Sequence, residues 1–191
     1  MSYKITLKEF DEKISNYVKY IQASLNNIAF NPEESITFIN QIDFDGKDLF
    51  NNKNQKGLYL FELNLESEKL VGMKNATKIS NFAKDWSKKS QNSFFSSSII
   101  DKRLKLQLDF KEQWLPVYIG KSKDMDKRIK EHLSLPPDKH TYAMKLNHRK
   151  SMYGLEFRVS KIEIDVENYD FIVPHLERVL RDKYLPIVGK Q

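Results

Sequence analysis

Cysteine is absent from the 191 residues of this sequence. Without thiols the chain has no disulfide framework, no thiolate zinc site and no cysteine nucleophile, and a reducing compartment is permitted. Long apolar runs are also missing: none approaches the roughly 20 residues that a membrane helix needs, and the first residues lead into no signal-peptide core. We therefore expect a soluble, cytoplasmic protein with no membrane partner.

The charge balance is only moderately basic, with 32 Lys and Arg against 26 Asp and Glu and a formal net charge of +6. This surplus is compatible with a polyanionic partner, but many basic proteins simply carry a solvated lysine-rich surface. The histidines are too scattered to form a recognisable zinc-ligand pattern. Composition alone therefore does not indicate a class of function, and the prediction of function depends on the sequence motifs.

The first 56 residues predict an N-terminal helical extension. Thr6-Leu7-Lys8-Glu9 has the spacing of a capping box, and apolar residues then recur every three or four positions from Phe10 to Leu25. A polar connection follows, with one short helix expected near residues 35–42. A strand is predicted at 57–63, where apolar and aromatic residues partly alternate with polar ones.

Residues from about 64 to 113 differ in composition from their flanks and are interpreted as an insertion. Apolar residues at helical spacing predict a helix over 77–89, whereas strict alternation over 104–110 favours a strand. Lys84 and Lys88 lie close to Trp86 and could contact a nucleic acid, but the same spacing equally predicts a packed helix face.

Two tripeptides carry the strongest signal in the chain, Gly57-Leu58-Tyr59 and Tyr118-Ile119-Gly120. Each lies in a strand-like apolar stretch. The second passes through Gly120 into a helical segment, which Ser122 or Asp124 can cap and which places Arg128 and His132 one turn apart on one face. Arginine presents a permanently charged planar fork that matches phosphate geometry. The arrangement is therefore phosphate-directed.

The C-terminal third predicts one more strand and one more helix. Apolar residues over 157–166 suggest a strand whose phase slips at Ser160-Lys161, as at a bulge. Pro174 suits the first turn of a final helix that runs to about Tyr184, before Pro186 ends it. Glu177 falls in the N-terminal half of that helix.

The two tripeptides resemble the signature of the GIY-YIG nuclease superfamily, with Leu58 in place of the first Ile. The resemblance implies an α+β fold with a small central antiparallel sheet flanked by helices, here over 57–191, joined to an N-terminal helix and carrying an insertion. It also implies a divalent-metal-dependent DNA endonuclease that uses Mg²⁺ or Mn²⁺. The long insertion is most similar to elaborated members of restriction or defence type.

The resemblance also implies roles for residues at the two tripeptides and the helix after them. Tyr59 would be the general base or would orient the attacking water, Tyr118 would support the same network, and Arg128 would bind the scissile phosphate. His132 would hydrogen-bond in the tyrosine network or assist proton transfer.

Glu177 would, by the same resemblance, anchor one divalent metal ion. A single carboxylate suffices, because Mg²⁺ favours oxygen ligands and keeps most of its own waters. Tyrosine has an ordinary pKa of about 10, so it needs a cationic neighbour or a metal to act as a base near neutral pH. Lys121, one residue past the second tripeptide, is the expected neighbour.

Simpler interpretations of these residues remain open. Tyrosines in strands are ordinarily core aromatics, and Arg128 lies in a charge-rich helix where an arginine is commonly solvated or ion-paired. Glu177 can pair with Arg181 four residues later in the same helix. Gly189 stands near the place where superfamily members often carry an Asn after a Pro, so a supporting contact of the site is missing or replaced.

Two alternatives to a restriction or defence nuclease follow. The first is a nucleic-acid-binding module that keeps the fold without catalysis, and the second is a structure-specific DNA repair nuclease. Double-strand cutting by a subunit with one site would require two copies or two encounters, so a homodimer is also expected as a partner arrangement.

Overall fold

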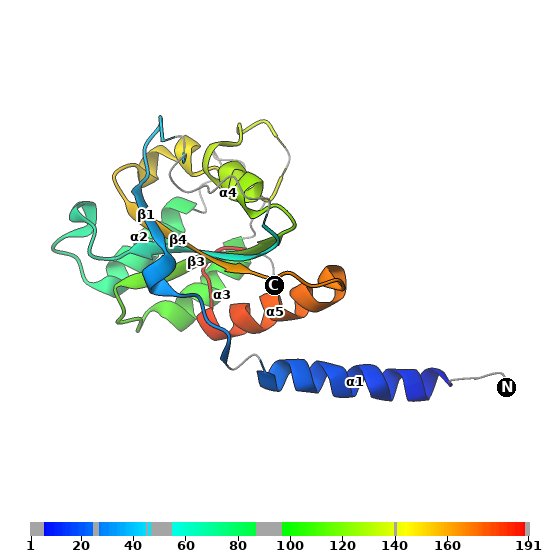
Figure 1. Cartoon of the computed structure of the whole chain (residues 1–191). Helices are drawn as coiled ribbons and strands as arrows, with labels where there is room; N and C mark the ends of the chain where they lie inside the picture. The colour runs from blue at the N-terminus through cyan, green and yellow to red at the C-terminus, as the bar shows by residue number, and fades with distance from the viewer. Residues whose placement is uncertain are drawn as a thin grey trace.

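The computed structural model describes residues 6–24, 27–44, 46, 55–86, 97–139 and 141–189. Within these ranges the protein has an α+β fold, with a four-stranded antiparallel sheet in the order β1-β4-β2-β3 (Figure 1). The strands are β1 (Ile36–Ile39), β2 (Gly57–Asn64), β3 (Trp114–Ser122) and β4 (Glu156–Glu163). The α-helices are α1 (Leu7–Ser24), α2 (Asn75–Trp86), α3 (Ser97–Gln107), α4 (Met125–Ser134) and α5 (Tyr169–Tyr184). Short 3-10 helices lie at Pro32–Glu34, Glu68–Leu70, Leu146–His148 and Lys150–Met152.

The pairing of β2 with β3 brings the two tripeptides side by side. Tyr59 lies opposite Gly120, and Phe61 lies opposite Tyr118. The register then shifts, because Glu62 pairs with Pro116 and leaves Val117 as the extra residue of a bulge. Val117 and Tyr118 consequently pack into the same core cluster although they are consecutive in the strand.

The two faces of the sheet are covered by different helices. On one face α2 and α4 pack over the rings of β2 and β3, and Trp86 and Phe61 are fully buried there. On the other face α5 packs over Leu58, Leu60 and Ile119. In Figure 1, α4 and α5 lie on opposite sides of the strands. Burial of each such large side chain contributes about 1.5–3 kcal/mol, so both faces hold β2 and β3 in place.

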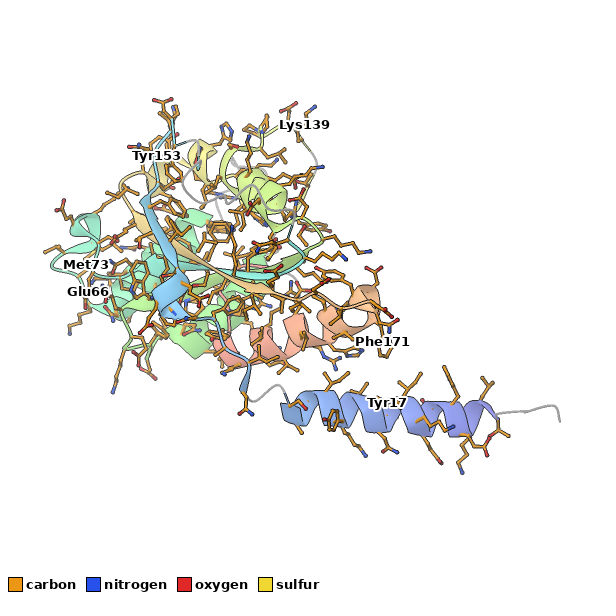
Figure 2. All side chains as sticks on the ribbon, in the orientation of Figure 1. Tyr17, Glu66, Met73, Lys139, Tyr153 and Phe171 are labelled. Atoms are coloured by element: carbon orange, nitrogen blue, oxygen red, sulfur yellow. The ribbon has the colours of Figure 1, made fainter. Side chains whose placement is uncertain are left out.

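The predicted N-terminal helix is confirmed, and its capping box is formed. The Thr6 backbone N–H donates to Glu9 Oε2 at 2.8 Å, and the Glu9 N–H donates to Thr6 Oγ1 at 3.3 Å. The helix α1 buries none of its own residues and projects from the body of the molecule, with Tyr17 standing clear of it (Figure 2). In the described part of the chain, no helix combines the length and apolar character needed to cross a membrane.

Other helix predictions agree with the structure. The predicted helix at 77–89 corresponds to α2, with its last three positions outside the described residues. Its Phe82 and Trp86 are buried, so this is a packed helix face. Asp124 caps α4 by accepting from the Lys127 N–H at 3.0 Å, and the helix ends before Pro136.

The expected short helix at 35–42 is wrong, because Ile36–Ile39 forms the edge strand β1. Its ladder partners are in β4, more than a hundred residues away, so the local sequence does not contain the interaction that makes it a strand. The sheet therefore draws on residues before position 57 as well as after it. The expected slip at Ser160-Lys161 is also wrong, because the register of β4 with β2 is continuous there.

The strand expected over 104–110 is wrong as well, because α3 extends through Gln107. From position 101 on, Arg103 and Gln107, four residues apart, are the buried residues of this helix, Leu104 packs against the core, and Leu106 is exposed. The Gln107 amide donates to the carbonyls of Tyr184 and Leu185 at the end of α5. The packed side of α3 thus joins two polar side chains with Leu104 at helical spacing, and the alternation of apolar residues predicted the wrong element.

The final helix begins earlier than expected. The helix α5 starts at Tyr169, and Pro174 lies inside it rather than in its first turn. Tyr169 anchors the helix start, since its hydroxyl donates to the Gly57 carbonyl at 3.2 Å. Glu177 therefore occupies the middle of α5, where it faces the sheet.

Candidate active site

Gly120 leaves a slot in β3 that the Tyr59 side chain fills. A Cβ atom at position 120 would lie 2.3 Å from the Tyr59 hydroxyl oxygen and 2.6 Å from its Cζ. It would also approach the Tyr118 ring at 2.8 Å. Any residue other than glycine would displace the phenol, so the two tripeptides form one unit in space.

His132 holds the hydroxyl of Tyr59 from α4. The Met144 backbone N–H donates to His132 Nδ1 at 3.0 Å, and His132 Nε2 lies 2.9 Å from the Tyr59 hydroxyl oxygen. Because Nδ1 accepts a hydrogen bond, the neutral ring carries its proton on Nε2 and donates it to Tyr59. Burial, and then the charge of Arg128, lower the pKa of His132 well below its ordinary value, so the ring is neutral.

Arg128 and Tyr118 lie beside the Tyr59 hydroxyl that His132 holds. The charge of Arg128 lowers the pKa of Tyr59, whereas Tyr118 raises it, so both groups are within electrostatic reach of the phenol. The three rings lie close together, with centroids 4.6 Å apart for Tyr118 and His132 and 6.1 Å apart for the tyrosines. The Tyr118 ring therefore lies beside the hydrogen-bonded pair of His132 and Tyr59.

The two tyrosines differ in how firmly they hold their protons. Burial raises the pKa of Tyr59 well above its ordinary value, and the neighbouring Tyr118 raises it further, while Arg128 lowers it. Burial also raises the pKa of Tyr118, but the charges of Arg128 and Arg181 oppose that shift, as does the neighbouring Tyr59 hydroxyl. Tyr118 is also the more exposed hydroxyl-bearing residue, at 6% against 1%. Of the two, Tyr118 is the better placed to receive a proton.

The carboxylate of Glu177 lies on the opposite face of β3, between two cations. Its Oε2 accepts from Lys121 Nζ, and its Oε1 accepts from Arg181 at 2.6 Å. The Glu177 side chain is buried, whereas that of Lys121 is 37% exposed. Arg181 also donates to the Ile119 carbonyl at 3.4 Å, which ties α5 to β3.

The site thus has two sides, which we call the tyrosine side (Tyr59, Tyr118, Arg128 and His132) and the carboxylate side (Lys121, Glu177 and Arg181). Strand β3 joins them, because Tyr118 and Lys121 are three residues apart and so face opposite ways. The charge of Glu177 raises the pKa of both Tyr59 and Tyr118, so the two sides lie within electrostatic reach of each other.

The structure brings together all six residues singled out in the sequence, but it gives Lys121 a different position from the expected one. Its ammonium group contacts Glu177, and Arg128 is the cation that lowers the pKa of Tyr59. The pairing of Glu177 with Arg181 that the helix spacing allowed is present. Arg128 also pairs with Glu131 one turn later.

Gly189 takes part in the site through its backbone. It has a left-handed φ of +124°, and a Cβ there would lie 3.4 Å from the Tyr118 ring. The preceding Ile187 and Val188 donate their N–H groups to the carbonyls of Pro116 and Val117. This C-terminal segment therefore supports Tyr118 by packing. Sequence reasoning missed this role, because the partner strand is distant in the chain.

The site offers a divalent cation one carboxylate, which is already paired with two cationic side chains. Glu177 offers one carboxylate, and in the described part of the chain no group of three or more His, Asp or Glu side chains could surround an ion. A hard ion that keeps most of its waters needs no more than one carboxylate together with substrate oxygens. Both oxygens of Glu177 are engaged by cations, so the half-exposed Lys121 ammonium would have to leave Oε2.

Comparison of the chain with protein-family models, with curated proteins and with solved structures found no match.

Proposed function

We propose that this protein is a divalent-metal-dependent DNA endonuclease of GIY-YIG type, with a restriction or defence role, acting inside the cell. The observation that carries the proposal is the slot at Gly120. The two tripeptides meet there, and the Tyr59 phenol fills the slot while its hydroxyl hydrogen-bonds to His132 and the charge of Arg128 lowers its pKa. Hydrolysis of a phosphodiester needs an activated water, neutralised phosphoryl oxygens and a stabilised leaving oxygen.

The tyrosine side supplies the first requirement. Tyr118 would act as the base in its phenolate form, which the charges of Arg128 and Arg181 favour. The phenolate would orient a water for in-line attack and take one of its protons, so that Tyr118 returns to the neutral phenol while the hydroxide attacks phosphorus. Tyr59, held by His132, would lie beside this phenolate and support it. General base catalysis of this kind contributes about 10²–10⁴ in rate.

The negative charge of the phosphate would be neutralised by Arg128 and by the metal ion that Glu177 holds. The Arg128 guanidinium, half-buried beside the tyrosines, binds the scissile phosphate. Glu177 would hold Mg²⁺ or Mn²⁺, which when bound supplies Lewis-acid stabilisation of the phosphoryl and leaving oxygens. Lys121, once released from Glu177, is free to bind a phosphate oxygen. The products would carry a 5′-phosphate.

A non-catalytic DNA-binding module is the second candidate, and one observation favours it. Lys121 and Arg181 already balance Glu177 without a metal, and Gly189 replaces the amide side chain found near this place in the superfamily. Such a module would bind DNA through the same arginines and leave it intact.

The test is incubation of the purified protein with supercoiled plasmid and unmodified phage DNA in Mg²⁺, with an EDTA control. Glu177→Ala and Tyr59→Phe are the active-site variants, and Asp170→Asn is the matched control on α5, since Asp170 is exposed and pairs with Lys123 at the surface. Discrete fragments made by the parent and the control, but not by the two variants, are expected.

Other outcomes separate the alternatives. Preferential cutting of branched or flapped DNA would assign the protein to repair. Tight DNA binding with no cleavage of any substrate in Mg²⁺ or Mn²⁺ would overturn the enzyme proposal and support the binding module.

A further inference from the structure

A hollow of about 320 Å³ lies between α3 and α5, next to the carboxylate side of the site. Its volume is at the lower end of the range for small-molecule pockets, which suits a group about the size of a nucleotide. It is lined by Lys102, Arg103, Leu106, Arg178, Arg181, Asp182 and Leu185. Neither helix face was singled out in the sequence.

The lining is strongly cationic. Four of its side chains are positively charged and only Asp182 is negatively charged. Arg181 shares its charge with Glu177, but in the part of the chain that the structure describes neither Lys102 nor Arg178 forms an ion pair. Both are exposed, so their charges face an approaching ligand.

Arg103, in the lining of this hollow, is held in place by the fold. It is buried, and its Nη1 donates to the Pro186 carbonyl at 2.9 Å. Burial lowers the pKa of Arg103, the like charge of Arg181 lowers it further, and the carboxylate of Asp182 opposes both effects. Two guanidinium groups are thus kept close together by the fold with one carboxylate near them. A further anion would offset the positive charge that Asp182 leaves, and a phosphate matches the guanidinium geometry.

We propose that this hollow holds one nucleotide of the DNA strand, with its phosphate against Arg103, Arg178 and Lys102 and its deoxyribose against Leu106 and Leu185. The proposal rests on the proposed function and specifies how DNA lies on the protein. Arg181 contacts both Glu177 and the hollow, so the bound nucleotide is close to the scissile phosphate in the same duplex. Such a contact fixes the register of the strand and carries no base information.

The first experiment measures DNA affinity without cleavage. Lys102→Glu combined with Arg178→Glu reverses two charges in the hollow. The matched control combines Lys105→Glu with Lys183→Glu, which reverses two exposed charges on the same helices outside it. The Kd of each protein for a fluorescent duplex is measured in EDTA at several salt concentrations. Circular dichroism confirms that all are folded.

We expect the slope of log affinity against log salt to fall by about 0.9 more in the hollow variant than in the control, because one phosphate contact is lost. Equal slopes and equal losses of affinity in the two double variants would overturn the proposal. If the parent cleaves nothing but shows this difference in slope, the proposed enzyme activity fails while the nucleotide site stands.

A second experiment uses a ligand that needs no duplex. Titration of the parent with a deoxynucleoside 5′-monophosphate, followed by NMR, should shift arginine side-chain resonances at millimolar ligand, and the hollow variant should show no such shift. Binding of the free nucleotide without any difference in duplex affinity between the two double variants would overturn the proposal, since the hollow would then serve a small molecule.

Discussion

The tyrosine side and the carboxylate side of the site are built by different forces. On the tyrosine side, Arg128 is the one charged member; Tyr59 and His132 are buried and neutral, and directional hydrogen bonds fix them in the chain from Met144 through His132 to Tyr59. On the carboxylate side, charged groups near the surface balance one another around Glu177. The first side is preorganised in the protein alone, whereas the second must exchange partners when a phosphate or metal ion arrives. Because of this difference, substitutions on the tyrosine side should lower kcat or stability, whereas those on the carboxylate side should change the requirement for metal ion.

Removing the hydroxyl of Tyr118 should have the largest effect. Tyr118→Phe is expected to lower kcat by about 10²–10⁴, because the acceptor of the water proton is lost. Tyr59→Phe should lower kcat by a smaller factor, since Tyr59 acts through Tyr118. Plasmid cleavage under single-turnover conditions measures both. Tyr153→Phe is the matched control, because its hydroxyl donates to the Asn147 carbonyl, away from the candidate site. A larger loss in Tyr59→Phe would make Tyr59 the base.

Filling the slot should damage stability as well as activity. Gly120→Ala places a methyl group 2.3 Å from the Tyr59 oxygen, and overpacking of this kind costs about 1–3 kcal/mol in the free energy of unfolding. Urea unfolding measures this loss. Gly72→Ala is the control, because a Cβ there meets nothing within 4 Å and only the left-handed φ of +82° is strained. Full cleavage activity in Gly120→Ala would show that Tyr59 need not lie in the slot.

The neutral state of His132 predicts a pH dependence of stability. In the unfolded chain this residue titrates near its ordinary pKa of about 6.5, but in the folded protein its pKa is far lower. Between these values only the unfolded state binds the proton. The free energy of unfolding should therefore fall as pH drops below about 6.5, by up to about 1.4 kcal/mol per pH unit.

The comparison of parent and His132→Gln by denaturant unfolding from pH 7 to pH 5 tests this effect. In the variant, the free energy of unfolding should no longer show the fall with decreasing pH that His132 causes. Leu133→Ala, which weakens the same helix but keeps His132, should retain the slope of the parent. An unchanged slope in His132→Gln would show that the ring is not kept neutral.

The smallest effect is expected on the carboxylate side. Lys121→Met frees Oε2 of Glu177, so the Mg²⁺ concentration for half-maximal cleavage should fall. Because the Lys121 side chain is partly exposed, its pairing is screened and the change should be about fivefold at most. Lys123→Met, which removes an exposed partner of Asp170, is the control and should leave the requirement unchanged. A higher Mg²⁺ requirement in Lys121→Met would show that the ammonium assists the metal rather than competing with it.

The features predicted from sequence are those whose causes are local. The capping box at Thr6 and the cap at Asp124 use side chains within a few residues of the helix start. The signature tripeptides predicted their strands for a similar reason, because each strand is buried along its own length. The resemblance then indicated which side chains would meet, but not how their hydrogen bonds would run.

Predictions from local sequence were wrong where an element's structure depends on contact with a segment far away in the chain. The strand β1 exists because of β4, and the buried polar face of α3 exists because α5 ends beside it. The position of Lys121 follows from strand alternation together with the packing of α5, which no single segment records. Gly189 likewise contributes only through the strand against which it lies. These are interactions between residues far apart in the sequence, and they override the local preference for helix or strand.

The short C-terminal segment that pairs with β3 has a consequence for association. An edge strand with unpaired N–H and C=O groups invites another chain to extend the sheet. The N–H groups of Ile187 and Val188 donate to the carbonyls of Pro116 and Val117 at the edge of the sheet. Pro116 itself has no N–H group that another strand could use. The edge next to Tyr118 is thereby closed to strand addition. The protein can keep a glycine-containing, apolar edge strand beside its candidate site and still resist aggregation through it.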